Sequence, residues 1–250
     1  MRRLFRIFLL VTLGLVIGVI SYEAIMFVRV LRLRNGNPSS TSLIDTRIKE
    51  AEAKGQQPRR EQVWVPLNQI SPNLQRAVLA GEDTNFVTHH GFDYEAIQKA
   101  FEQAQREAAK QAKAEGEDDD WLPNLPEFKR GGSTISQQLA KNLYLSSQRS
   151  FLRKGQEAAL TIMLERSLTK RRILEIYLNV IEWGDGIYGA EAAAQHYFHK
   201  PASALTANEA AFLSAMIPNP RTVFNPQVNP RRVARRQRII LRGMPYVKLP

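Results

Sequence analysis

The first residues that could do chemistry are an acidic pair, Glu82 and Asp83, followed closely by Phe86 and His89. Glu82 comes at the end of an apolar helix pattern and precedes the aromatic residue Phe86 by four positions. A carboxylate half shielded from water in this way can have its pKa raised towards working pH, as a general base or acid requires. An ordinary surface Glu-Asp pair at a helix end would have the same sequence, and the local pattern does not distinguish a catalytic carboxylate from such a pair.

The second group is a glycine pair that opens into hydroxyl residues at an expected helix start: Gly131, Gly132, Ser133 and Thr134. Glycines let a ligand approach the backbone closely, and the free N–H groups of a helix start favour negative charge. Thr134, Gln138 and Lys141 are spaced i, i+4 and i+7 and share one helix face. That polar stripe suits a phosphate or sugar groove, although an ordinary helix cap after a turn fits the glycines too.

A third group combines cations with a carboxylate. Arg153 and Glu157 are four residues apart and therefore lie on one helix face, with Lys154 next to Arg153 in the sequence. Such a set can face a diphosphate jointly, whereas the plainer interpretation is an ion pair on a helix surface. The segment from Lys170 to Asn179 is mainly structural, with Glu175 and Asn179 able to brace the site from behind.

The elements that must position these residues are helices. Helix starts are expected at Ser71-Pro72, Asp93, Ser133 or Thr134, Ser150, Thr169, Thr206 and Asn229-Pro230. Sustained alternation of β-branched residues is missing from the sequence, so the body is predicted to be mainly α. A loop containing an acidic run is expected at about residues 112–130.

The bulk composition narrows the function classes. The chain has 250 residues, a net charge of +11 and no cysteine. The absence of cysteine excludes disulfides and thiolate metal sites, and the positive charge suits nucleic acid, an anionic membrane or a phosphate-rich substrate. The residues after Glu209 contain many arginines and no acid. A basic helix near a membrane anchor is expected to lie against anionic head groups, and a solvated basic tail is the plainer alternative.

One long apolar run, Ile7 to Val28, lies near the N-terminus and would span roughly 33 Å as a helix, enough to cross a bilayer. A cleaved signal peptide would show a shorter run and a small-residue cleavage site. The sequence therefore divides into a tail (1–6), a transmembrane anchor (7–28), a stalk (29–62) and a catalytic body (63–250). Three arginines flank the run on each side, so the charge count does not fix its orientation.

Taken in order and spacing, these groups resemble the peptidoglycan glycosyltransferases of glycosyltransferase family 51, and in particular the monofunctional biosynthetic transglycosylases. The resemblance covers about Trp64 to Pro226. It implies a helical, lysozyme-like fold with a head lobe and a membrane-touching jaw lobe. It also implies polymerisation of lipid II into β-1,4-linked glycan, with inversion and release of polyprenyl diphosphate.

The resemblance also implies roles for the residues. Glu82 matches the family's base, and Glu157 matches its second essential carboxylate, which assists near the donor diphosphate. The family's donor-site residues around the diphosphate and sugar are matched by Thr134, Gln138, Lys141 and Arg153. Further substrate-binding residues are expected at the flanking positions Gly131, Gly132, Ser133 and Lys154. Asp83, Phe86 and His89 would shape the acceptor side.

The same resemblance implies a setting. The protein would be a single-pass protein of the bacterial inner membrane with its catalytic domain in the periplasm, and its partners would include proteins of cell-wall synthesis or division. Nucleic acid is not an expected partner, because the basic C-terminal part has few aromatics for bases to stack on. A divalent cation, Mg²⁺ or Mn²⁺, assists some family members, but no carboxylate cluster in this sequence specifies a metal site.

Two other functions remain open from the residues. A lytic enzyme on a lysozyme-like scaffold would use Glu82 as a general acid to cleave glycan, but it would not need a cationic groove for a diphosphate. A non-catalytic anchored scaffold of a cell-wall assembly complex would tolerate Glu82→Gln without loss of function in cells.

Overall fold

A computed structural model describes residues 2–99, 101–102, 105–106, 133–146 and 150–250, and it confirms the mainly helical class. Residues 94–99, after the predicted start at Asp93, are also helical. The principal helices are α1 (Arg2–Arg32), α2 (Ser42–Ala53), α3 (Pro72–Glu82), α5 (Ile135–Tyr144), α6 (Phe151–Ser167), α7 (Lys170–Val180), α8 (Ala190–Phe198), α9 (Ala207–Met216) and α10 (Pro230–Gly243).

Most predicted helix starts are confirmed by side-chain caps. Ser71, Thr134, Ser150, Thr169 and Thr206 each accept a hydrogen bond from a backbone N–H in the first turn of the helix that follows. These caps satisfy N–H groups that have no partner within the helix, which is why such residues mark the starts.

A small sheet accompanies the helices. Its strands are β1 (Glu61–Gln62), β2 (Glu182–Gly184) and β3 (Ile187–Tyr188), with β3 in the middle, parallel to β1 and antiparallel to β2. Strands of two or three residues are too short to show a period-two pattern, which is why sequence analysis did not find them.

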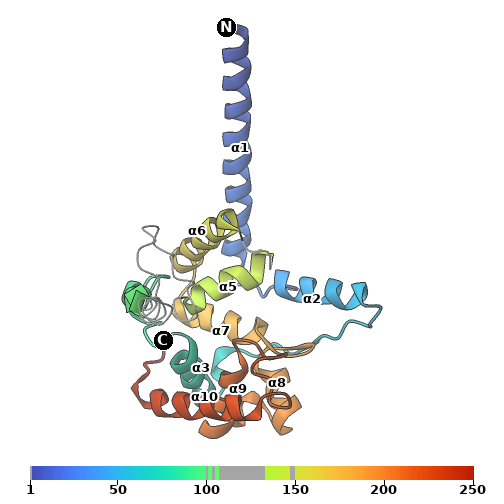
Figure 1. The fold of residues 1–250 in the computed structure, drawn as a ribbon, viewed down its shortest axis with the longest axis vertical. Helices are drawn as coiled ribbons and strands as arrows, with labels where there is room; N and C mark the ends of the chain where they lie inside the picture. The colour runs from blue at the N-terminus through green and yellow to red at the C-terminus, as the bar shows by residue number, and fades with distance from the viewer. Residues whose placement is uncertain (1, 100, 103–104, 107–132, 147–149) are drawn as a thin grey trace, which may run out of the picture.

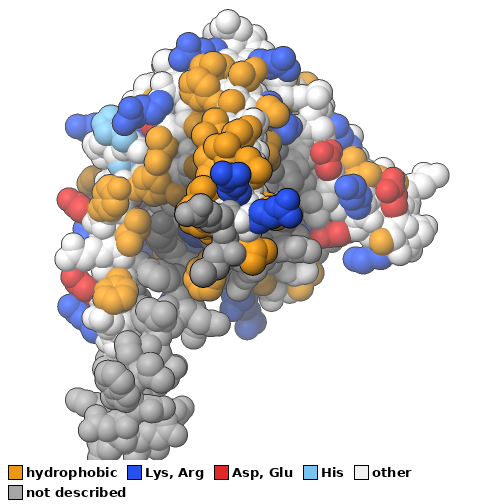
Figure 2. Space-filling view, turned by 90° about the horizontal axis from the view of Figure 1, so that it is seen from above, with side chains coloured by type: hydrophobic (Ala, Val, Ile, Leu, Met, Phe, Trp, Pro, Cys, Tyr) orange, Lys and Arg blue, Asp and Glu red, His pale blue; other side chains and the backbone are white. Residues whose placement is uncertain are grey.

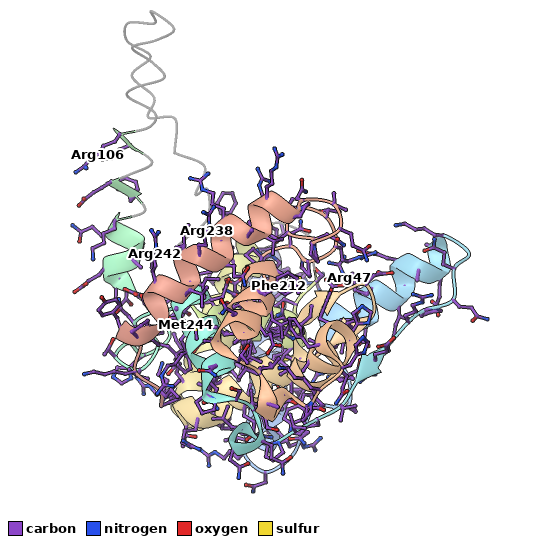
Figure 3. All side chains as sticks on the ribbon, turned by 90° about the horizontal axis from the view of Figure 1, so that it is seen from below. Arg47, Arg106, Phe212, Arg238, Arg242 and Met244 are labelled. Atoms are coloured by element: carbon purple, nitrogen blue, oxygen red, sulfur yellow. The ribbon has the colours of Figure 1, made fainter. Side chains whose placement is uncertain are left out.

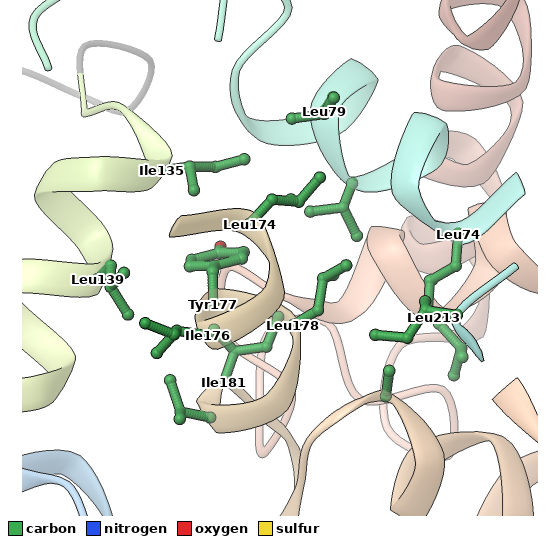
Figure 4. Packing of buried hydrophobic residues seen from close by; sticks show 14 of the residues in the cluster. Leu74, Leu79, Ile135, Leu139, Leu174, Ile176, Tyr177, Leu178, Ile181 and Leu213 are labelled. Atoms are coloured by element: carbon green, nitrogen blue, oxygen red, sulfur yellow. The ribbon is translucent and has the colours of Figure 1, made fainter. Parts of the chain in front are cut away.

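The core is organised around α7. Its residues from Ile173 to Val180 are buried almost without exception, so this helix is enclosed on nearly all sides. Tyr177 lies between α5 and α3, near Ile135 and Leu139 of the former (Figure 4). Helices α3, α9 and α10 pack together at one end of the body, and α5 and α6 pack together at the other (Figure 1).

In the described part of the chain, α1 is the one helix long and apolar enough to cross a membrane, judged by length and composition. It stands out from the body (Figure 1), but its last turns are docked on it. Met26, Val30 and Leu33 are buried, and α1 packs against α6. Arg172 donates to the carbonyl of Leu33 at 2.8 Å. This long apolar helix therefore continues directly into the folded body.

The segment expected to be a stalk is also folded against the body. Helix α2 packs against α5, and its Ile44 is fully buried. Arg47 of α2 forms an ion pair with Glu182 of β2 at 2.9 Å. The polar composition of this segment thus reflects one exposed helix face, not an extended linker.

The expectation that the basic C-terminal helix would lie against head groups beside the anchor is wrong in this arrangement. Helix α10 lies at the end of the body opposite α1 (Figure 1). Its apolar side chains Val233 and Ile240 are buried, and packing with α9 and α3 holds the helix there.

Candidate active site

Glu82 is the last residue of α3 and is held by two other helices. Arg236 of α10 approaches Glu82 Oε1 at 2.7 Å, and Gln138 of α5 donates to Oε2 at 3.0 Å. The Glu82 side chain is 9% exposed. The helix ends here because Asp83 adopts an extended backbone while its N–H still bonds to the carbonyl of Leu79. Three helices thus fix one nearly buried carboxylate.

Burial raises the pKa of the Glu82 carboxyl above its ordinary value. The positive charge of Arg236 and the hydrogen bonds from Gln138 and Arg236 oppose this rise, whereas the charge of neighbouring Asp83 adds to it. Glu82 therefore combines the two properties of a general base: higher basicity than a surface glutamate, and a cation that favours its ionised form.

Gln138 connects Glu82 to the core. Its side-chain carbonyl accepts a hydrogen bond from the Tyr177 hydroxyl at 2.7 Å, which leaves the amide nitrogen to donate to Glu82. Tyr177 is fully buried in α7. The chain from Tyr177 through Gln138 fixes the orientation of the amide and with it the position of the carboxylate.

Asp83 points away from Glu82 into a buried network. One oxygen accepts the backbone N–H of Ile135, the first residue of α5, at 2.9 Å. His89 lies 2.9 Å from the other oxygen through Nε2, and its Nδ1 accepts the N–H of Gly91. The carboxylate of Asp83 therefore occupies part of the helix N-terminus where the sequence suggested an anion cradle.

Thr134 and Gly91 complete this network. Thr134 caps α5 in a capping box with Gln137 and donates its hydroxyl to the carbonyl of Gly91 at 2.7 Å. Gly91 has φ +97°, and a Cβ there would lie 2.8 Å from Cγ2 of Thr161 in α6. This close approach joins the loop after α3 to α6, one turn beyond Glu157.

The third predicted group forms within the first turns of α6. Glu157 is buried, and its carboxylate oxygens accept hydrogen bonds from the Arg153 guanidinium at 2.8 Å and from Nζ of Lys154 at 2.5 Å. Nε of Arg153 is buried and has no hydrogen-bond partner among the described residues. The Lys154 side chain is 53% exposed. One carboxylate thus holds two cations side by side in the first turns of α6.

The remaining predicted residues fall into three classes. Phe86 is buried, and Nζ of Lys170 lies 4.5 Å from the centroid of its ring. Phe86 therefore supports the loop after α3 from inside. Ser133 and Lys141 are exposed at the start and on the outer face of α5. Gly131 and Gly132, together with the expected acidic loop, lie outside the described residues.

The predicted bracing residues Glu175 and Asn179 support the chain before α3. Glu175 accepts the N–H of Leu67 at 3.0 Å, and the Asn179 side chain pairs with both backbone groups of Val65 at 2.9 Å. They position the segment that leads into Ser71 and do not contact Glu82 directly.

Arg236 is the site residue that sequence analysis missed. It looked like one of many C-terminal arginines, but it lies three residues after Val233 and four before Ile240, which form the buried face of α10. An arginine at the edge of an apolar helix stripe is a signal for an inward-pointing cation. Its guanidinium also lies 5.5 Å from the ring centroid of Phe224.

The described residues do not fit a resident divalent cation at either carboxylate. Glu82 and Glu157 are already matched with cationic side chains of the chain itself. Within the described ranges there is also no group of three or more His, Asp or Glu side chains placed to bind a metal ion.

Comparison with known proteins places this geometry in a family. The sequence matches the family described as "Transglycosylase" over residues 48–116 and 121–245. A "Biosynthetic peptidoglycan transglycosylase" of Thiobacillus denitrificans is 46% identical over 232 residues, covering 93% of this chain and 92% of the relative. A protein of the same name from Chromobacterium violaceum is 43% identical over 98% of this chain and 99% of the relative. The chain therefore belongs to the transglycosylase family and is a peptidoglycan glycosyltransferase.

Proposed function

We propose that this enzyme polymerises lipid II into β-1,4-linked glycan strands, with Glu82 as the base that activates the attacking hydroxyl. The observation that carries the proposal is the setting of Glu82, a nearly buried carboxylate held by Arg236 and Gln138. Family membership and relatives named for peptidoglycan transglycosylation support the substrate class.

In the proposed reaction, the 4-hydroxyl oxygen of the incoming unit attacks C1 of the growing chain from the face opposite the diphosphate. Glu82 accepts the hydroxyl proton as the new C–O bond forms. The bond between C1 and the diphosphate breaks, and its electron pair leaves with the polyprenyl diphosphate. Attack and departure on opposite faces convert the α-linked donor into a β-linked product.

The first turns of α6 suit the departing diphosphate. Arg153 and Lys154 place two positive charges side by side there, and the Lys154 side chain is largely exposed. Glu157 orients both cations and limits their mutual repulsion. Positive groups fixed before the reaction stabilise developing negative charge without having to reorganise.

The acceptor side is supported by residues that act through others. Asp83 and His89 hold the loop after α3 against the first residue of α5, and Phe86 fills the space beneath that loop. Their role is to keep Glu82 and Gln138 in register, so substitution there would displace the base. Ser133, Gln138 and Lys141 remain the proposed substrate-facing residues at the start and along one face of α5, with Gly131 and Gly132 before them. Thr134 is buried and holds the start of α5 in place for them.

The lipid part of the substrate requires a membrane setting, with α1 as the anchor in the inner membrane and the body on the periplasmic side. In the view from the α1 side, α1 points towards the reader, and its apolar side chains between Leu4 and Val28 are largely exposed (Figure 2). Phe151 and Leu152, at the start of α6, are 98% and 88% exposed. Exposed apolar side chains beside an anchor suit contact with acyl chains.

The lytic alternative is less well supported by the same geometry. A general acid must hold a proton before the reaction, whereas a guanidinium 2.7 Å from Glu82 favours the ionised carboxylate. The same contact is an advantage to a base.

The test is incubation of the full-length protein in detergent with labelled lipid II, with products resolved by gel, beside Glu82→Gln. Long glycan from the wild type that a muramidase can digest, and no glycan from the variant, is the expected result. Shortening of preformed glycan without polymerisation would move the enzyme to the lytic class, and full activity of the variant would exclude Glu82 as the base.

A further inference from the structure

A row of arginines runs along the outer face of α10. Arg231, Arg235, Arg238 and Arg242 are spaced i, i+4, i+7 and i+11, and all four are exposed. At about 100° per residue they fall on one line along the helix, opposite the buried Val233 and Ile240. We call these four residues the arginine stripe.

The stripe is not neutralised within the protein. In the ranges that the structure describes, none of its four guanidinium groups has a hydrogen-bond or ion-pair partner. The sequence contains no acidic residue after Glu209. Like charges at successive helix turns repel each other, so an ordinary solvated helix face would carry interspersed acids. An unbalanced row of this kind suits an anionic partner.

The position of the stripe separates it from the membrane and links it to the active site. Helix α10 crosses the face of the body opposite α1, and Arg238 and Arg242 lie along it in the view from that side (Figure 3). The same helix sends Arg236 inward to Glu82. The stripe is thus the outer side of an element whose inner side reaches the proposed base.

We propose that the arginine stripe binds the carboxylates of the stem peptides on the newly made glycan strand. This inference rests on the proposed function, because that reaction makes a polymer with a peptide on each repeating unit. A peptide attached through its N-terminus ends in a free carboxylate, so the strand presents a carboxylate at each repeating unit. Guanidinium groups recognise carboxylates through paired hydrogen bonds.

The dimensions and neighbours of the stripe suit such a strand. From Arg231 to Arg242 the helix rises roughly 16 Å, which allows more than one contact with a single strand. Ile239, 62% exposed beside the stripe, adds an apolar contact for the aliphatic part of a peptide. Several weak contacts on one strand would slow its release and so favour longer products.

The test measures strand binding by full-length protein in detergent on two immobilised ligands: glycan strands that carry stem peptides, and strands from which an amidase has removed them. The stripe variant is Arg231→Gln, Arg235→Gln, Arg238→Gln and Arg242→Gln. A matched control removes four cations near α2 on another part of the surface: Lys49→Gln, Lys54→Gln, Arg59→Gln and Arg60→Gln. Melting temperatures verify that both variants fold.

We expect the stripe variant to lose about tenfold in affinity for peptide-bearing strands, while the control stays close to wild type. Binding to peptide-free strands should change in neither variant. Equal losses in both variants would reduce the effect to net charge and overturn the proposal, as would unchanged affinity in the stripe variant. A loss confined to vesicles of anionic phospholipid, tested in parallel, would identify a lipid surface instead and also overturn it.

Two further measurements keep the outcome separate from folding and catalysis. If the glutamine variant does not fold, wild-type affinity should fall with added salt for peptide-bearing strands and not for peptide-free strands. Glu82→Gln should retain strand binding, because binding requires no transfer step. Polymerisation by Glu82→Gln would therefore refute the proposed base and would not bear on the arginine stripe. Strand affinity that does not depend on the stem peptides would refute only the proposal for the stripe.

Discussion

Glu82 and Glu157 are both nearly buried carboxylates with cationic partners, yet the sequence supports them in different ways. Glu157 is held within a single helix turn, by Arg153 and Lys154 of α6. Glu82 is held by side chains 56 and 154 residues away, from α5 and α10. The first arrangement is local and the second depends on the whole fold.

The chemical consequence differs as well. Glu157 contacts two cations and orients them. Glu82 contacts one cation and one neutral donor, and burial raises its pKa. A group that must accept a proton during the reaction needs this higher basicity. The comparison assigns proton transfer to Glu82 and diphosphate stabilisation to the Glu157 group.

The largest expected effect separates the two carboxylates directly. Glu82→Gln keeps the shape and removes the base, so lipid II turnover should fall by about 10²–10⁴-fold. Glu157→Gln should cost less, about 10–100-fold, because Arg153 and Lys154 remain. Initial rates with labelled lipid II measure both, with circular dichroism as the check on folding. A smaller loss for Glu82→Gln than for Glu157→Gln would reverse the assignment.

The next effect concerns the cation that Glu157 orients. Arg153→Ala should reduce kcat/KM for lipid II by about tenfold or more, because it removes one of the two cations proposed to stabilise the diphosphate. Arg166→Ala, at an exposed position later in α6, is the matched control and should have little effect. Equal activity of the two variants would make Arg153 a surface ion pair.

A pH profile sharpens the role of Arg236. Its charge lowers the pKa of Glu82, so Arg236→Gln should raise that pKa further. A base works in its ionised form, and the rate falls as pH drops through its pKa. The acid limb of the profile should therefore move to higher pH, and Arg236→Lys should restore most of the shift. A uniform loss at all pH values would indicate a structural role instead.

The smallest effects are on stability and concern two glycines of the same region. Gly91→Ala forces a Cβ against Thr161 at positive φ and should destabilise the protein by about 1–3 kcal/mol. Gly155 lies inside α6 with nothing within 4 Å of a Cβ. Gly155→Ala should instead stabilise by about 0.5–1 kcal/mol. Thermal unfolding measures both, and a stabilising Gly91→Ala would contradict the close approach.

Local chemistry explains what the sequence could predict. Capping residues, apolar periodicity and the i, i+4 spacing of Arg153 and Glu157 act over a few residues, so the helix starts and the α6 ion pair followed from them. The family resemblance added the assignment of Glu82 as base, which local pattern alone left open.

Long-range packing explains what the sequence could not predict. The contact of Arg236 with Glu82 requires α10 to pack beside α3, and nothing near either residue encodes that distance. Asp83 looked like a substrate-side group beside Glu82, yet the fold turns it to the start of α5. The placement of α10 away from α1 also depends on tertiary packing, which is why charge alone suggested the wrong neighbour.

The assignment of Glu82 as the base is tested by the pH dependence of lipid II polymerisation by the wild type, measured beside Glu82→Gln at every pH. This assignment predicts an acid limb for the wild type with a midpoint above the ordinary glutamate value of 4.5, and no polymer from the variant at any pH. Polymerisation by Glu82→Gln that follows the same curve as the wild type would contradict it, because another group would then carry the proton.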